Sequence, residues 1–131
     1  MNKKTKILYW INSAEHDLVA AESLYNSKRF DWCLYIGSLV IEKTLKAFII
    51  YSNENNFPPK THDLIHLTKK INYKFSDEHL LFFETVSNFN IEAIYPDEKF
   101  SFYKLCDEEF TSLYFTKIKE MFIWLKSLMK L

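Results

Sequence analysis

Two histidines four positions apart are the first residues of this 131-residue chain whose types and spacing point to chemistry. The segment 62–66, H-D-L-I-H, puts both imidazoles on one helix face, as in the zinc-hydrolase motif H-E-x-x-H. Aspartate replaces the motif's glutamate, so its carboxylate lies about one methylene too far back to act as the base. A third ligand would have to come from elsewhere, with Glu84 the nearest candidate. We therefore expect no metal and no other cofactor, and interpret His62 and Asp63 as residues that fix the first turn of a short helix.

Charged residues also interrupt an apolar stretch at Glu42, Lys43 and Lys46. One interpretation is that Glu42 and Lys46 form an i,i+4 pair on a solvated strip, which stabilises a helix by about 0.2–0.5 kcal/mol. The other is that Lys43 and Lys46 present their charges to a groove beside Lys60 and His62. The sequence leaves both interpretations open.

Three further residues have two possible roles each. Asp17 can cap a helix or pair with Lys43 inside the protein, and a structural role is favoured. Tyr95 and Phe102 fall in a predicted loop, where they can stack on a nucleic-acid base or pack in a core or dimer interface. We favour packing, because large aromatic side chains are usually in contact with other groups.

Composition excludes several classes of protein. The chain has 17 basic and 17 acidic residues, so no overall field attracts it to nucleic acid, and any such contact must come from a local patch. Gly37 is the single glycine, which excludes the glycine-rich loops that grip phosphate in P-loop and dinucleotide-binding proteins. One glycine and three prolines are also too few for a disordered linker or a turn-dense β-sandwich.

The chain is expected to be cytoplasmic and to have no membrane partner. Its basic N-terminus is not followed by the apolar segment of a signal peptide, and no run approaches the roughly 20 apolar residues of a membrane span. Cys33 and Cys106 lie far apart and match no metal or redox spacing. They are therefore interpreted as two buried free thiols.

Apolar residues recur at steps of three and four along most of the chain, as in amphipathic helices, and no strand-like alternation is present. The pattern predicts long helices from Ile7 to Tyr25 and from about Asp31 to Tyr51, a short one capped by Thr61, a fourth capped by Ser76 and a last one from about Asp107. The segment 91–104, which contains a proline and has no clean period, is predicted to be a loop.

The helix from about Asp31 to Tyr51 is apolar on nearly all sides. A small protein has little other mass to cover such a helix, so we expect it to associate with a second copy. Gly37 and Ser38 in its middle would let another helix approach closely. The expected fold is one all-α domain over residues 1–131, an up-and-down four-helix bundle with one additional short helix, assembled as a homodimer.

Four motifs in this order resemble those of the HEPN (higher eukaryotes and prokaryotes nucleotide-binding) domain family, and they cover nearly the whole chain. They are Ala14, Asp17, Leu18 and Ala21; then Val40, Glu42, Lys43, Leu45, Lys46 and Ala47; then Pro59, Thr61, His62, Asp63 and Leu64; and finally Tyr95, Pro96 and Asp97. The resemblance implies a dimeric helical bundle that binds nucleotides or RNA. Many relatives are encoded beside a minimal nucleotidyltransferase. The resemblance also implies that the His62 turn can line the groove where a phosphate or base docks.

Another branch of that family consists of metal-independent ribonucleases, often toxins of toxin–antitoxin systems, with an Arg-x(4–6)-His motif. This chain departs from that pattern. Ile94 stands where relatives have an arginine before the tyrosine-proline turn, and the single arginine, Arg29, lies far from the next histidine, His62. Cleavage by the 2′-hydroxyl needs an acid or base such as histidine near a cation. The segment 90–104 holds lysines but no imidazole, so no catalytic residue is assigned.

The sequence therefore predicts a protein that binds nucleotide or RNA phosphate and works with a partner such as a minimal nucleotidyltransferase. The candidate ligand-binding residues are Lys43, Lys46, Lys60, His62, Asp63, Tyr95 and Asp97. The alternatives are a metal-independent ribonuclease of a toxin–antitoxin system and a purely structural adaptor subunit.

Overall fold

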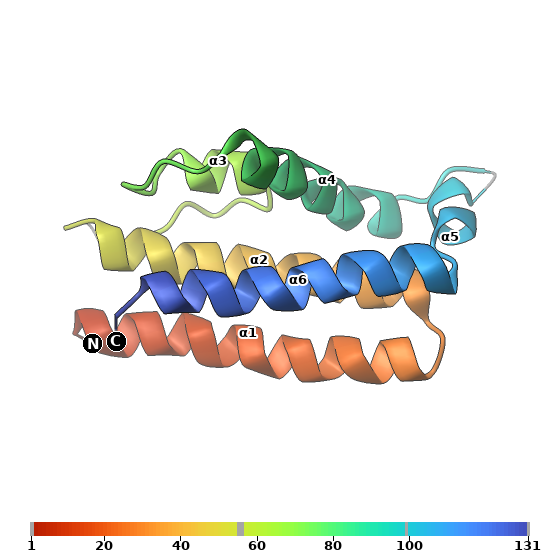
Figure 1. Cartoon of the computed structure of the whole chain (residues 1–131), viewed down its shortest axis with the longest axis horizontal. Coiled ribbons are helices and arrows are strands. Elements are labelled where there is room, and N and C mark those ends of the chain that lie inside the picture. The colour runs from red at the N-terminus through yellow and green to blue at the C-terminus, as the bar shows by residue number, and fades with distance from the viewer. Residues whose placement is uncertain (1, 55–56, 99, 131) are drawn as a thin grey trace.

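The predicted apolar periodicity forms helices throughout the computed structural model, which describes residues 2–54, 57–98 and 100–130 (Figure 1). In these residues the helices are α1 (Lys3–Asn26), α2 (Phe30–Ser52), α3 (Leu64–Thr68), α4 (Asp77–Ile94), α5 (Ser101–Leu105) and α6 (Glu108–Leu128). None of the helices described is both long enough and apolar enough to cross a membrane.

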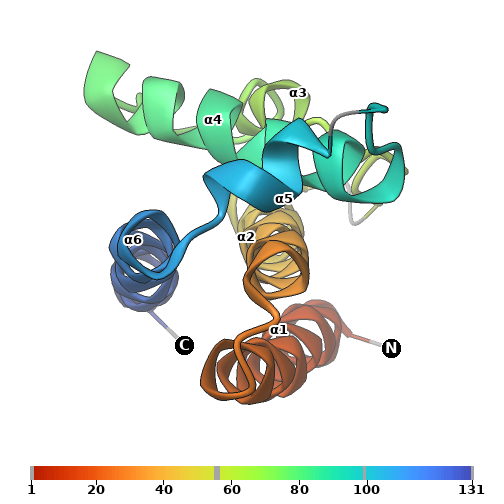
Figure 2. The same cartoon turned by 90° about the vertical axis from the view of Figure 1, so that its right-hand side faces the viewer.

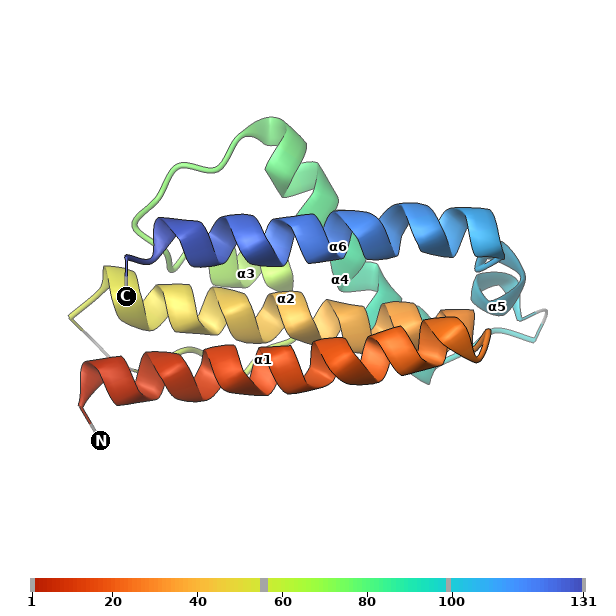
Figure 3. The same ribbon diagram turned by 60° about the horizontal axis from the view of Figure 1, so that its bottom comes forward.

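The four long helices alternate in direction, so the predicted up-and-down bundle is confirmed (Figure 1). α1, α2 and α6 run side by side, whereas α4 crosses them obliquely (Figures 2 and 3). Two short helices are present among the described residues instead of one, because α5 forms within the segment predicted as a loop. α4 extends to Ile94, so residues 91–94 of the predicted loop are helical, and it ends before Tyr95 because proline disfavours helical backbone in the residue before it.

The helix starts test the predicted caps. Ser76 caps α4 with its side-chain oxygen, as predicted, and Asp107, the predicted start of the last helix, caps α6 in the same way. Thr61 is the wrong cap for α3, because the carboxylate of Asp63 accepts the free backbone N–H groups there while the Thr61 hydroxyl accepts the N–H of Asp63 itself. Asp31 lies in the first turn of α2 and does not cap it, since that helix already begins at Phe30.

α2 is the central helix of the molecule. It packs against α1, α3, α4, α5 and α6 (Figure 2). From Val40 to Ile50 every residue is buried except the half-buried Lys43. The premise that one subunit cannot cover this helix completely is therefore wrong for its C-terminal half, where the other helices fold onto it from several sides, but it holds for the N-terminal half, where Trp32 is 45% exposed. Dimerisation itself stays a prediction.

Gly37 is the point of closest approach between α2 and α6. A Cβ atom added to this glycine would lie 2.8 Å from Cδ1 of Ile118 on α6. That separation is shorter than any van der Waals contact between carbons, so the predicted role of a small residue in close helix packing is confirmed.

We predict that Gly37→Leu destabilises the protein by about 1–3 kcal/mol, because a long side chain must push α6 away. Gly37→Ala is the matched control. Its methyl group meets only the movable end of Ile118, and alanine gains about 1 kcal/mol of helix propensity over glycine. Urea unfolding monitored by circular dichroism measures both variants. Equal stability of Gly37→Leu and wild type would contradict close packing at this position.

The two cysteines are free and buried, as predicted. Burial is the main reason why the pKa of Cys33 is raised to about 12, with the nearby Glu22 carboxylate adding to it. Burial also raises the pKa of Cys106 to about 12. A raised pKa disfavours the thiolate, which is the reactive form, so both thiols stay protonated at neutral pH.

We therefore predict that neither thiol reacts with a disulfide reagent in the native protein at pH 8. With a pKa about 4 above that pH, roughly one thiol in ten thousand is ionised, and burial also blocks access. The reagent should titrate both cysteines once guanidinium chloride unfolds the chain. Rapid labelling of either thiol in the native state would contradict the described burial.

Candidate functional site

The carboxylate of Glu42 lies at the centre of a buried polar cluster. Glu42 is on α2 and is only 5% exposed. Its Oε1 atom lies 2.6 Å from Nδ1 of His62, and its Oε2 atom accepts a hydrogen bond of 3.1 Å from Nζ of Lys46. Each carboxylate oxygen therefore has its own partner, as a buried carboxylate requires.

The predicted pairing of Glu42 with Lys46 is confirmed, but the predicted solvated strip is wrong. Lys46 is 7% exposed. Its ammonium lies 5.3 Å from the centre of the Trp10 ring on α1, a cation–π contact. The pair is buried because Trp10 approaches from one helix and His62 from the loop before α3. Each charge then depends on the other for stabilisation, since neither is well solvated.

His62 is held rigidly but remains accessible. A carboxylate only accepts hydrogen bonds, so Nδ1 carries the proton given to Glu42 and Nε2 is left for other chemistry. The His62 side chain is 66% exposed. Its backbone is tied to α4, because the Ser87 hydroxyl donates to the His62 carbonyl and accepts the Leu64 N–H. The imidazole is therefore fixed at Nδ1 by Glu42, while its Nε2 edge remains accessible to solvent.

Lys43 joins α1 to α2. Its Nζ atom lies 2.7 Å from Oδ2 of Asp17 and 2.8 Å from the Ser13 hydroxyl. The pairing foreseen for Asp17 is therefore present. The charges of Lys43 and Lys46 are both balanced by carboxylates, whereas Lys60 is exposed and has no ion pair recorded among the described residues. Of the predicted cations, Lys60, which stands two residues before His62 in the chain, alone forms no ion pair with another described residue.

A cavity of about 420 Å³ opens between the start of α3 and α4, beside His62. It is lined by His62, Asp63, Ile65, Glu84, Ser87, Asn88 and Ile91. The sequence analysis missed Ser87 and Asn88 and considered Glu84 only as a metal ligand. The four α4 residues of this lining, Glu84, Ser87, Asn88 and Ile91, have the i, i+3, i+4, i+7 spacing of one helix face. This spacing could have predicted from the sequence that they lie together. Within residues 2–54, 57–98 and 100–130, no group of three or more metal-binding side chains is close enough to hold an ion.

The structure does not bring Tyr95 and Asp97 to this cavity. Tyr95 lies one turn beyond Ile91 and is strongly exposed. Asp97 accepts a 2.9 Å hydrogen bond from the backbone N–H of Ser101, at the start of α5. Of the seven predicted ligand residues, the cavity is lined by His62 and Asp63, whereas Tyr95 and Asp97 follow the end of α4 and lie outside its lining. Phe102 is buried against core aromatics, as the packing interpretation required, whereas Tyr95 is not packed in the core of this chain.

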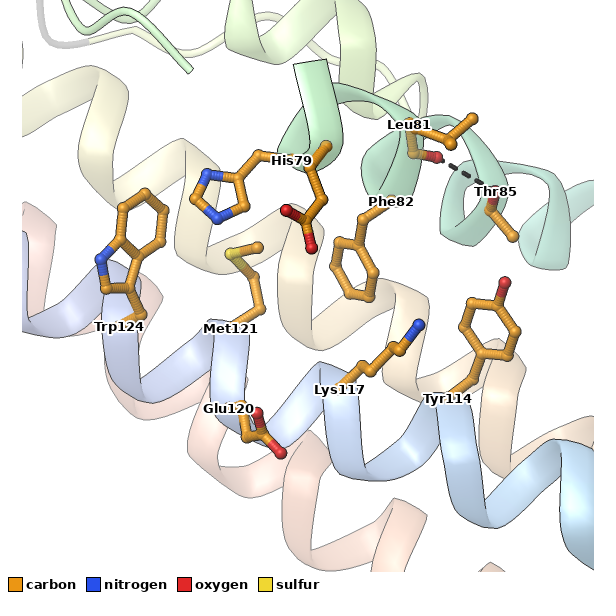
Figure 4. Close-up of a pocket in the computed structure, with 10 residues that line it drawn as sticks. His79, Leu81, Phe82, Thr85, Tyr114, Lys117, Glu120, Met121 and Trp124 are labelled. Atoms are coloured by element: carbon orange, nitrogen blue, oxygen red, sulfur yellow. Dashed lines mark hydrogen bonds between the residues drawn. The ribbon is translucent and has the colours of Figure 1, made fainter. Parts of the chain in front are cut away.

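A second cavity, of about 560 Å³, separates α4 from α6 (Figure 4). It is lined by Glu78, His79, Leu81, Phe82, Thr85, Tyr114, Lys117, Glu120, Met121 and Trp124. The ring centroids of His79 and Trp124 lie 4.4 Å apart, and the Nζ atom of Lys117 lies over the Tyr114 ring. Glu120 points away from the other labelled side chains in Figure 4. Since most of the lining is aromatic or aliphatic, this cavity suits packing better than proton transfer.

We predict that Glu42→Ala destabilises the protein by about 3–5 kcal/mol, because the Lys46 ammonium is left buried without a counter-charge. Glu84→Ala, which removes an exposed carboxylate, should change stability by less than about 0.5 kcal/mol. The double variant Glu42→Ala/Lys46→Met should recover most of the loss, because no charge is then left unpaired. Urea unfolding measures all three. A Glu42→Ala variant as stable as the Glu84→Ala control would contradict the ion pair.

Residues 7–128 match the family model of the HEPN domain. Comparison with curated proteins and with solved structures finds no match. The match extends from the first turns of α1 to the last residue of α6, so it includes every helix described above and the His62 turn. This chain therefore belongs to the HEPN domain family, an all-helical family of nucleotide- and RNA-related proteins.

Proposed function

We propose that this chain binds the phosphate of a nucleotide or an RNA through His62 and Lys60, in the loop before α3. The observation that carries the proposal is the geometry of His62. Its Nδ1 atom contacts the buried carboxylate of Glu42, and about two thirds of its side chain is exposed. An imidazole held in this way loses little side-chain entropy on binding, and in its doubly protonated form it donates from Nε2 to a phosphate oxygen while Nδ1 still donates to Glu42. Membership of the HEPN domain family supports this class of ligand.

The other predicted ligand residues have different roles in this proposal. Lys43 and Lys46 have structural roles, because each is already paired with a carboxylate, Lys43 with Asp17 and Lys46 with Glu42. Asp63 caps α3 and so orients the turn that carries His62. Tyr95 and Asp97 are left out of the phosphate site, since they lie beyond the end of α4.

We further propose that the chain acts in the cytoplasm as a homodimer with a partner such as a minimal nucleotidyltransferase. Support for the assembly comes from exposed apolar side chains, which include Trp32 on α2 at 45% and Leu81 on α4 and Ile123 on α6 at 66% each. Exposed apolar groups on neighbouring helices suit a protein partner. The free thiols of Cys33 and Cys106 fit a reducing compartment.

A metal-independent ribonuclease is the second candidate, and the Glu42–His62 pair is the observation that favours it. A carboxylate on Nδ1 orients an imidazole so that Nε2 can act as a general base. The cation that must stabilise the developing charge would be Lys60, because Arg29 lies in the turn between α1 and α2. Lysine lacks the two-pronged grip of arginine on phosphate, so binding without cleavage remains the first proposal.

Titration with labelled ATP, GTP and a short RNA at low salt tests binding, because phosphate contacts are strongest there. We predict that Lys60→Ala and His62→Ala each weaken binding of all three ligands by roughly tenfold, and that Lys60→Ala reduces the salt slope by about one. Lys117→Ala, on the other cavity, is the matched control and should leave binding unchanged.

Two outcomes would overturn the proposed site. Absence of binding at millimolar concentration would remove the function, and weaker binding by Lys117→Ala alone would move the site to the cavity between α4 and α6. Incubation with transfer RNA and EDTA tests the second candidate, which requires cleavage that His62→Ala abolishes.

A further inference from the structure

The cavity beside His62 has the wrong charge for a phosphate. Asp63 and Glu84 both line it, and its remaining polar side chains besides His62 are the Ser87 hydroxyl and the Asn88 amide. A phosphate entering it would meet two carboxylates, which repel an anion. If phosphate binds at His62 and Lys60, this cavity is left for a different, uncharged part of the same ligand.

The polar groups of the cavity have a definite donor and acceptor order. One oxygen of Asp63 already accepts the backbone N–H groups of Ile65 and His66. Glu84 is exposed on α4 and has no ion pair recorded among the described residues, so both of its oxygens can accept from a ligand. Asn88 lies one turn further along α4, on the same face, and its amide can donate. The wall formed by α4 therefore presents two adjacent acceptors followed by a donor.

Apolar side chains complete the cavity. Ile65 on α3 and Ile91 on α4 contribute to its lining, and Ile91 is 60% exposed. Aliphatic groups beside a row of polar atoms suit a flat ring whose edge carries the polar groups. A volume of about 420 Å³ is within the range of pockets that hold a small organic ligand. α3 and α4 lie side by side above α2 (Figure 1), and both helices contribute side chains to the lining of the cavity.

The geometry points to a guanine base as the occupant of this cavity, an inference that rests on the proposed phosphate site at His62 and Lys60. Guanine has two adjacent donors, N1–H and N2–H, which match the two oxygens of Glu84, and its O6 acceptor matches the Asn88 amide. Adenine presents an acceptor, N1, at the position where guanine presents N1–H, so it would meet the carboxylate with a lone pair. The cavity then selects the base while the loop holds the phosphate.

Binding of GMP, AMP, CMP and inorganic pyrophosphate to the full chain tests this inference. A bidentate pair of this kind gives roughly tenfold to hundredfold discrimination, so GMP should bind more tightly than AMP or CMP by that factor. A short RNA with a single guanine, compared with one that has none, shows whether the base is read in RNA as well as in a free nucleotide.

Glu84→Gln is the decisive variant, because it keeps the shape of the side chain and removes one acceptor oxygen. It should reduce GMP binding to the level of AMP and leave pyrophosphate binding unchanged. Lys60→Ala should instead weaken every probe by a similar factor. Glu78→Gln, on the cavity between α4 and α6, is the matched control and should retain the preference for GMP. Circular dichroism melts check that each variant is folded.

The outcomes separate the two proposals. Equal affinity for GMP, AMP and CMP would overturn the guanine inference and leave the phosphate site standing. A preference for GMP that Glu84→Gln does not change would also overturn it, because the base would then lie elsewhere. If no nucleotide, pyrophosphate or RNA binds at all, the proposed function fails and this inference fails with it.

Discussion

The carboxylate of Glu42 links the core of the protein to its candidate site. It is buried on α2, where it balances the ammonium of Lys46 and accepts the Nδ1–H of His62. A buried carboxylate is costly unless both oxygens are satisfied, so the loop before α3 has to deliver an imidazole to this position. The same requirement fixes where His62 stands on the surface. Stability and the placement of the candidate ligand residue are therefore coupled through one side chain.

That coupling depends on how completely α2 is covered. Trp10 of α1 lies on one side of Lys46, and the His62 turn lies on the other side of Glu42. The Ser87 hydroxyl holds this turn against α4, because it donates to the His62 carbonyl and accepts the Leu64 N–H. Three separate parts of the chain thus meet around two charged residues. A rigid site on the surface of a small helical protein follows from this convergence.

Charge is also sorted around His62. The exposed Lys60 lies in the loop before His62 and does not line the cavity, whereas Asp63 and Glu84 do. A ligand that is anionic at one end and rich in N–H donors at the other fits this division, and nucleotides have that character. The net charge of zero could not reveal this separation, because a sum over the whole chain contains no information on where the charges lie.

The sequence by itself determined the helical class, the approximate extent of the long helices, the Ser76 cap and the Glu42–Lys46 pair. These follow from interactions between residues three or four positions apart, which any helix of this pattern forms. Only the tertiary structure decided that this pair is buried, that His62 completes it, and that Glu84, Ser87 and Asn88 face His62 across a cavity. It also separated Tyr95 and Asp97 from that cavity, because the angle at which α4 crosses the bundle sets which of its turns lies beside the loop. Contacts between distant segments depend on such packing angles, and local periodicity does not encode them.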